Sequence, residues 1–321
     1  MKLCAILIGE IRTLDSCIHS IKRLFKDILN VDFFVVINKK SNIICDFDYY
    51  DKLIKDNLKP KTIDYIEINQ KDLSSIQMKN KLFENINIEI TNMSFDEYSK
   101  LDTKETFHTV EEIENLDVKY EKKIINGNQF CSYPYNLYIE DYMLNIGFQN
   151  IKETDNYTHV FRLRTDVAWF EDFQSRNIYV DSINDISIHQ NYNNISQQSF
   201  IKPEYNQIVK NLDFNVLKNN ILNEISQSPE LIILSSFFYI KQLNIYFPSS
   251  HVQFMSYNNM KKWLDLYKDN NIEQLIKATK RYPKLGPNWQ GEQLQKMFIE
   301  ELNLNINKNL FFHFYSTIIR R

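Results

Sequence analysis

Two arginines and an aspartate lie close together in residues 157–166, Tyr-Thr-His-Val-Phe-Arg-Leu-Arg-Thr-Asp. Strand alternation would place Arg162 and Arg164 on one face, with Asp166 in line just past them. Two guanidinium groups aimed the same way can clamp a diphosphate, and a carboxylate beside them can hold a divalent cation. The alternative is a structural ion-pair network with acids on neighbouring elements. Because the whole chain has only eight arginines, we favour the functional role.

A second candidate, residues 9–12 (Gly-Glu-Ile-Arg), directly follows the first apolar run of the chain. Gly9 would let a ligand or backbone approach closely. Arg12 precedes a predicted helix, and helix N-termini favour anions. We expect Gly9, Glu10 and Arg12 to contact a nucleotide phosphate or base. The alternative is an ordinary strand-to-helix turn with a solvated arginine.

A third candidate spans residues 286–292, Gly-Pro-Asn-Trp-Gln-Gly-Glu, where a turn opens a helix. Trp289 could stack on a sugar ring. Glu292 could hydrogen-bond a sugar hydroxyl or act as a general base on an acceptor. Capping is the alternative role for Glu292, since acids are favoured in the first turn of a helix.

The histidines carry weaker signals. His251 and His313 could each ligate a metal or contact substrate, although a half-buried structural histidine is the commoner case. His159 faces away from the arginines in its strand, and we expect it to pack or to hydrogen-bond in the core.

Strands and helices alternate along the chain, which predicts an α/β fold with a mixed, mostly parallel sheet. The carboxyl ends of parallel strands are where such folds bind ligands, and the first two candidates lie at strand ends. Residues 70–125 are polar with weak periodicity and are interpreted as an insertion with short helices or loops. The predicted strands are 3–8, 31–37, 61–68, 157–164, 231–240 and 310–314, and the principal predicted helices are 15–28, 129–144, 256–268 and 292–302.

Composition excludes several classes of protein. A net charge of −3 and a pI near 6.1 give no electrostatic footprint for nucleic acid. Five glycines, at 9, 127, 147, 286 and 291, cannot build a P-loop or a Gly-x-Gly-x-x-Gly fingerprint. The four cysteines show no Cys-x-x-Cys pairing, so we expect free thiols and a cytoplasmic location. No apolar run is long enough for a membrane span, which leaves peripheral membrane association open.

The order of these features resembles the capsule- and lipopolysaccharide-type glycosyltransferases. The resemblance consists of an opening strand ending in Gly-x-x-Arg, a helix, a strand beginning with Asp, and later a Tyr followed by Arg-x-Arg-x-Asp. A helix that opens with an acid is a looser match. In this sequence the matching residues are Gly9, Arg12, Asp32, Tyr157, Arg162, Arg164, Asp166, Glu292 and Leu294.

The resemblance implies a GT-A fold in one domain, residues 1–321. Residues 1–170 would mainly bind the nucleotide-sugar donor, and 171–321 the glycan or glycoconjugate acceptor. The implied activity is hexosyl transfer (EC 2.4) in glycan biosynthesis, with Mn²⁺ or Mg²⁺ on the diphosphate. Glu292 would be the base of an inverting reaction, or only a binding residue in a retaining one.

This sequence departs from the common Asp-x-Asp metal motif of that fold, because Arg164 occupies the first position. Either Asp166 holds the metal with a distant residue such as His313, or the arginines take over part of the charge neutralisation. His251 stands where an acid is expected on the acceptor side. Trp289 and Glu292 complete the expected acceptor site.

Two other functions stay open. A sugar nucleotidyltransferase is disfavoured, because such enzymes usually carry a Gly-rich loop after the first strand. A non-catalytic carbohydrate-binding or scaffold protein on the same fold would show no nucleotide-dependent stabilisation.

Overall fold

The computed structural model divides the chain into two compact units. The first comprises Met1–Asn69, Tyr142–Lys261 and Leu304–Arg321, and the second Gln70–Asp141 and Lys262–Asn303. The predicted single domain with a boundary near residue 170 stays a prediction. The structure describes residues 1–11, 13–39, 46–67, 88–93, 120–125, 128–130, 134–171, 187–188, 213–230, 233–234, 237–240, 245–248, 252–268, 277–278, 281, 290–305 and 316–320.

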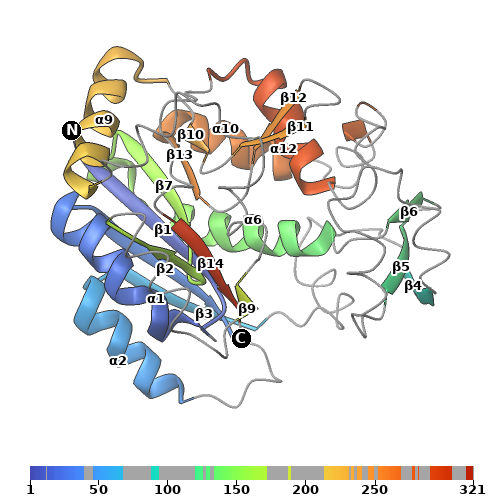
Figure 1. Ribbon diagram of the computed structural model, residues 1–321, viewed down its shortest axis with the longest axis horizontal. Coiled ribbons are helices and arrows are strands. Elements are labelled where there is room, and N and C mark those ends of the chain that lie inside the picture. Colours follow the sequence, from blue (N-terminus) through green and yellow to red (C-terminus); the bar gives the residue numbers. More distant parts are fainter. Residues whose placement is uncertain are drawn as a thin grey trace. The chain divides into compact units, whose positions relative to one another are not determined.

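A six-stranded sheet, in the order β10-β13-β7-β1-β2-β3, forms the centre of the first unit (Figure 1). Strands β7, β1, β2 and β3 are parallel, and β13 is antiparallel to β7. This sheet confirms the predicted α/β class with a mixed, mostly parallel sheet. The strands are β1 (Leu3–Gly9), β2 (Asp32–Asn38), β3 (Thr62–Ile66), β7 (His159–Arg164), β10 (Ile233–Leu234) and β13 (Val252–Ser256).

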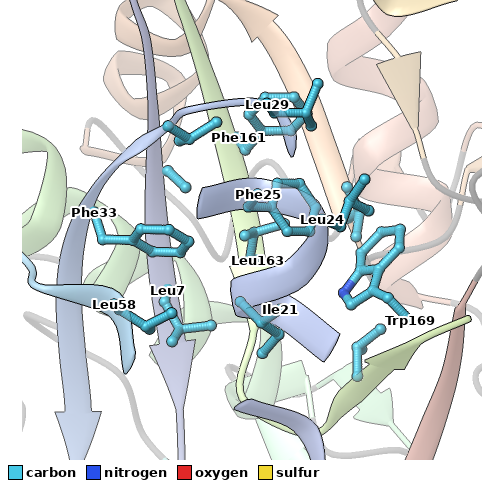
Figure 2. Close-up of a cluster of buried hydrophobic side chains, with 14 of the residues drawn as sticks. Leu7, Ile21, Leu24, Phe25, Leu29, Phe33, Leu58, Phe161, Leu163 and Trp169 are labelled. Atoms are coloured by element: carbon cyan, nitrogen blue, oxygen red, sulfur yellow. The ribbon is translucent and has the colours of Figure 1, made fainter. Parts of the chain in front are cut away.

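The inner strands β1 and β2 are apolar along both of their faces, so both faces of the sheet must be covered. On one face, helices provide this cover. The helices whose side chains join this core are α1 (Leu14–Ile21), the π-helix η1 (Lys22–Ile28), α2 (Phe47–Leu58) and α9 (Phe214–Gln227). Figure 2 shows Phe25 of η1 at its centre. The ring of Phe25 meets Phe161 and Trp169 edge-on, at centroid distances of 5.2 and 5.0 Å. These contacts pack η1 against β7 and against β8 (Val167–Trp169).

On the second face, α6 (Pro134–Gln149) approaches the sheet through a glycine. A Cβ on Gly147 would overlap the Cγ2 atom of Ile6 and lie 3.3 Å from that of Val36. The predicted helix start at residue 129 is wrong, because Gln129 belongs to strand β6 (Asn128–Phe130). The helix α6 starts at Pro134 instead, because proline suits the first turn of a helix, where its missing N–H is not needed.

Two further predictions need correction. The predicted strand 231–240 is two strands in different sheets: β10 pairs with β13, and β11 (Phe237–Ile240) pairs with β12 (Ile245–Pro248). The helix predicted to start at residue 15 begins at Leu14, with Thr13 at the N-cap position and Asp15 in the first turn.

The expected helical insertion, 70–125, is described only at β4 (Ile88–Met93) and β5 (Tyr120–Ile125), and both are strands. They form an antiparallel sheet with β6. The alternation Ile-Glu-Ile-Thr in β4 suits a strand better than a helix. The predicted strand 310–314 lies outside the described residues.

The remaining described elements are the 3-10 helix η3 (Glu153–Asp155), β8 (Val167–Trp169), β14 (Ser316–Arg320), β9 (Ser187–Ile188), α10 (Tyr257–Lys268) and α12 (Gln290–Glu301). β14 pairs with both β8 and β9. In the second unit, Trp263 of α10 meets Phe298 of α12 edge-on, with ring centroids 5.5 Å apart. Among the described helices, none is both long and apolar enough to cross a membrane.

Candidate functional site

The carboxyl ends of β1 and β7 are joined at one edge of the main sheet. Ile8 pairs with Arg164 in the parallel register. The Thr165 N–H donates to the Ile8 carbonyl at 3.1 Å. The Thr165 hydroxyl donates to the Glu10 carbonyl at 2.6 Å. The two segments that the sequence singled out therefore meet, with Thr165 as the link between them.

Gly9 is required by this junction. Its φ of +141° lies in a region that residues with a side chain rarely adopt. A Cβ at this position would also overlap the Thr165 hydroxyl. The close approach expected at Gly9 is thus made by Thr165. The expected donor contacts of Gly9 and Glu10 stay predictions.

Arg164 and Asp166 form a bidentate ion pair across the turn that follows β7. Arg164 Nε donates to Asp166 Oδ1 and Arg164 Nη2 to Oδ2, each at 2.8 Å. The arginine side chain is 18% exposed and the aspartate 10%. An ion pair was the alternative to a functional role, and here one forms within the segment itself.

Arg162 lies on the same sheet face as Arg164, as predicted, because Phe161 and Leu163 point into the core on the opposite face. The two arginines differ in depth. Arg162 is 0% exposed and lies in register with Ile6 on one side. On the other side it is in register with Gln253, which is also 0% exposed. Arg164, not Arg162, reaches the sheet edge, and a donor contact for Arg162 stays a prediction.

A metal site on Asp166 does not fit the residues that the structure describes. Both oxygens of this carboxylate already accept hydrogen bonds from a cationic side chain. No group of three or more His, Cys, Asp or Glu side chains within the described ranges could hold a metal ion. His313, the expected second ligand, is outside them.

Several predicted site residues are not described. The donor residue Arg12, the acceptor residues His251 and Trp289 and the metal ligand His313 lie outside the described residues. Of Glu292 only the backbone is given. That backbone places Glu292 in the first turn of α12, as predicted.

Asp32 and Tyr157, two residues of the family resemblance, lie together at the opposite, amino edge of the sheet. The Tyr157 hydroxyl donates to Asp32 Oδ2 at 2.7 Å. Burial, and then this hydrogen bond, raise the pKa of Tyr157 well above its usual value. Lys2 and Lys61 lie 3.9 and 4.0 Å from the same carboxylate oxygen. The hydrogen bond between Tyr157 and Asp32 ties the start of β2 to the segment before β7.

His159 is buried and structural, as expected. Its Nε2–H donates to the Pro229 carbonyl at 2.9 Å, and its ring stacks on Phe254 at 5.3 Å between centroids. Burial lowers the pKa of His159, which favours the neutral imidazole.

Sequence reasoning missed two polar residues at the carboxyl edge. Thr165 links the two strand ends, and Asn38, 3% exposed, ends the neighbouring strand β2. The position of Thr165 between Arg164 and Asp166 was the available signal. Its partner, a main-chain carbonyl 155 residues away, leaves no trace in the sequence.

No protein-family model and no curated protein sequence matches this chain. Among solved structures it is similar to an active-site mutant of LgtC, with 10% identity, 93% of this chain and 70% of that chain covered, and a TM-score of 0.35. It is also similar to mouse xyloside xylosyltransferase 1 (9% identity, 96% and 84% covered, TM-score 0.36). A third is core-mannan synthase A from Aspergillus fumigatus in a Mn/GDP form (8%, 93% and 69%, 0.32). These are transferases or synthases by name, and at such TM-scores the likeness carries no weight for activity.

Proposed function

We propose that the protein is a glycosyltransferase that binds a nucleoside-diphosphate sugar at the carboxyl edge of the main sheet. The observation that carries this proposal is the junction of β1 and β7. It brings Glu10 and an oriented Arg164 to the edge where open α/β sheets bind ligands. The polar sequence segments that suggested donor binding thus converge on one place.

In this proposal, cationic side chains stabilise the charge that develops on the departing nucleoside diphosphate. A guanidinium offers planar, bidentate hydrogen bonds that match phosphate oxygens. Hydrogen-bond donors that are already held in place before the reaction are the most effective for this purpose. Arg164 is held by Asp166, and Arg12 and Arg162 are the further cations that we assign to the donor.

The acceptor hydroxyl oxygen attacks the anomeric carbon of the donor sugar, and the bond from that carbon to the diphosphate oxygen breaks. In an inverting reaction the hydroxyl proton passes to Glu292. In a retaining reaction Glu292 only binds the acceptor, and the hydroxyl proton passes to the departing diphosphate oxygen. His251 and Trp289 are assigned to acceptor binding on their sequence positions alone.

A thermal-shift screen of UDP-, GDP- and CMP-sugars, with Mn²⁺ and with EDTA, tests donor binding. We expect a diphosphate sugar to stabilise the protein, and CMP-sugars, which carry one phosphate, to stabilise it less. Arg164→Gln should weaken donor binding roughly tenfold or more, the cost of losing a charged hydrogen bond. Arg23→Gln, which breaks the exposed pair with Glu171, is the matched control.

The bound donor is then incubated with candidate glycans, and the released nucleoside diphosphate is measured. If no nucleotide sugar stabilises the wild-type protein, the transferase proposal fails. That outcome would instead indicate the carbohydrate-binding alternative, which predicts no nucleotide-dependent stabilisation.

A further inference from the structure

We propose that Asp166 is a positioning residue, which orients the Arg164 guanidinium toward the donor diphosphate, and is not a metal ligand. This inference rests on the proposed function for the identity of the ligand. It assigns Asp166 a different role from the one that the Asp-x-Asp comparison suggests.

The geometry of the Arg164–Asp166 pair fixes the orientation of the guanidinium. Side-on pairing through Nε and Nη2 fixes both the position and the plane of the guanidinium. Because the five N–H donors of arginine lie in one plane, fixing two of them sets the direction of all. Arg164 is thereby held in one orientation at the sheet edge.

Thr165, in the turn between Arg164 and Asp166, is anchored by two hydrogen bonds. Thr165 is 1% exposed and is hydrogen-bonded through its N–H to Ile8 of β1 and through its hydroxyl to Glu10, the residue after β1. Its main chain therefore cannot swing away from β1 without breaking both bonds. Since Arg164 and Asp166 flank this anchored residue, their ion pair is tied to the same place as the Glu10 carbonyl.

Electrostatic repulsion disfavours a metal ion on Asp166. A divalent cation bound to Asp166 would lie next to a guanidinium that already neutralises the carboxylate, and the two positive charges would repel. Because the pair is largely sheltered from water, solvent would screen this repulsion only weakly. The arrangement favours an arginine, rather than a metal, opposite the phosphates.

Nucleotide binding by four proteins tests the positioning role: wild type, Asp166→Asn, Arg164→Lys and the double variant. Isothermal titration uses UDP, GDP and inorganic pyrophosphate in EDTA. We expect Asp166→Asn to weaken binding of the preferred ligand roughly tenfold, because its neutral amide cannot hold the guanidinium side-on. In the Arg164→Lys background the same change should have less than about a threefold effect, since the group that it positions is gone.

Mn²⁺ binding alone tests the competing role, and it needs no donor. Wild type and Asp166→Asn should bind Mn²⁺ equally weakly, as should the control Asp213→Asn, whose side chain caps α9. If wild type binds Mn²⁺ more tightly than Asp166→Asn does, the inference is overturned. Equal effects of Asp166→Asn in both Arg164 backgrounds would also overturn it.

The ligand-free melting temperature reports whether each variant folds. Where Asp166→Asn does not fold, Asp166→Glu replaces it. The longer side chain keeps a carboxylate for a metal but displaces it from the guanidinium, so positioning predicts weaker nucleotide binding with unchanged Mn²⁺ binding. If neither UDP, GDP nor pyrophosphate binds the wild type, the proposed function fails, and the Mn²⁺ titration still decides the role of Asp166.

Discussion

At the scale of single residues, the carboxyl edge depends on the backbone of Gly9. Gly9→Ala should lower the free energy of unfolding by roughly 2–4 kcal/mol, from backbone strain and from overlap with the Thr165 hydroxyl. Urea denaturation measures this loss. Thr165→Ala removes the overlapping hydroxyl, so Gly9→Ala should cost less in that background. An equal cost in both backgrounds would show that the overlap is unimportant.

His159 predicts a dependence of stability on pH. Burial lowers its pKa in the folded protein, so the unfolded chain, with an ordinary value of about 6.5, binds the proton more tightly. Stability is therefore full above that pH and falls as the pH drops below it. His159→Gln keeps a donor for the Pro229 carbonyl but cannot titrate, and its stability should fall less between pH 7.5 and pH 5.5, values that span roughly one unit either side of an ordinary histidine pKa. Urea denaturation at both pH values compares the two proteins, and parallel losses would contradict this role.

At the scale of elements, the contact of α6 with the sheet depends on Gly147. Alanine is the better helix former by about 1 kcal/mol, yet its methyl group would overlap Ile6. We expect Gly147→Ala to destabilise the protein by about 1–3 kcal/mol, the usual cost of overpacking. The exposed Gln149→Ala in the same helix is the control and should change stability by less than about 0.5 kcal/mol. A stabilising Gly147→Ala would mean that α6 moves without cost.

The hydrogen bond between Tyr157 and Asp32 ties β2 to the segment before β7. Tyr157→Phe should cost about 1–2 kcal/mol of stability, because a partly buried carboxylate loses a donor. Binding of UDP or GDP should be unchanged, since this pair lies at the amino edge of the sheet. Weakened nucleotide binding at unchanged stability would show that Tyr157 belongs to the functional site.

Local sequence pattern predicted most elements of the first unit correctly. The apolar runs of β1 and β2 and the amphipathic α1 are local signals that need no partner to be read. The pattern was wrong where partners decide the structure. Residues 231–240 read as one apolar strand, but β10 and β11 hydrogen-bond to different strands.

At the scale of the whole molecule, two buried thiols report on opening of the main sheet. Neither Cys4 nor Cys17 is part of a disulfide, as predicted for these two cysteines, and both are 0% exposed. Burial raises the pKa of Cys4 far above its usual value, so its reactive thiolate is scarce. We expect iodoacetamide to modify neither residue until the protein unfolds globally, as read by peptide mass mapping across a denaturant series. Modification of Cys4 well before the unfolding transition would show that β1 opens locally.

The sequence by itself determined the α/β class, the strand-helix order and the concentration of charged residues after β1 and β7. These follow from periodicity and from neighbours along the chain. Only the tertiary structure decided how those charges are used. It paired Arg164 with Asp166, gave Gly9 its positive φ against Thr165, and joined Asp32 to Tyr157 across 125 residues. The physical reason is that hydrogen bonds and steric contacts act through space, and the chain brings such partners together only when the sheet forms.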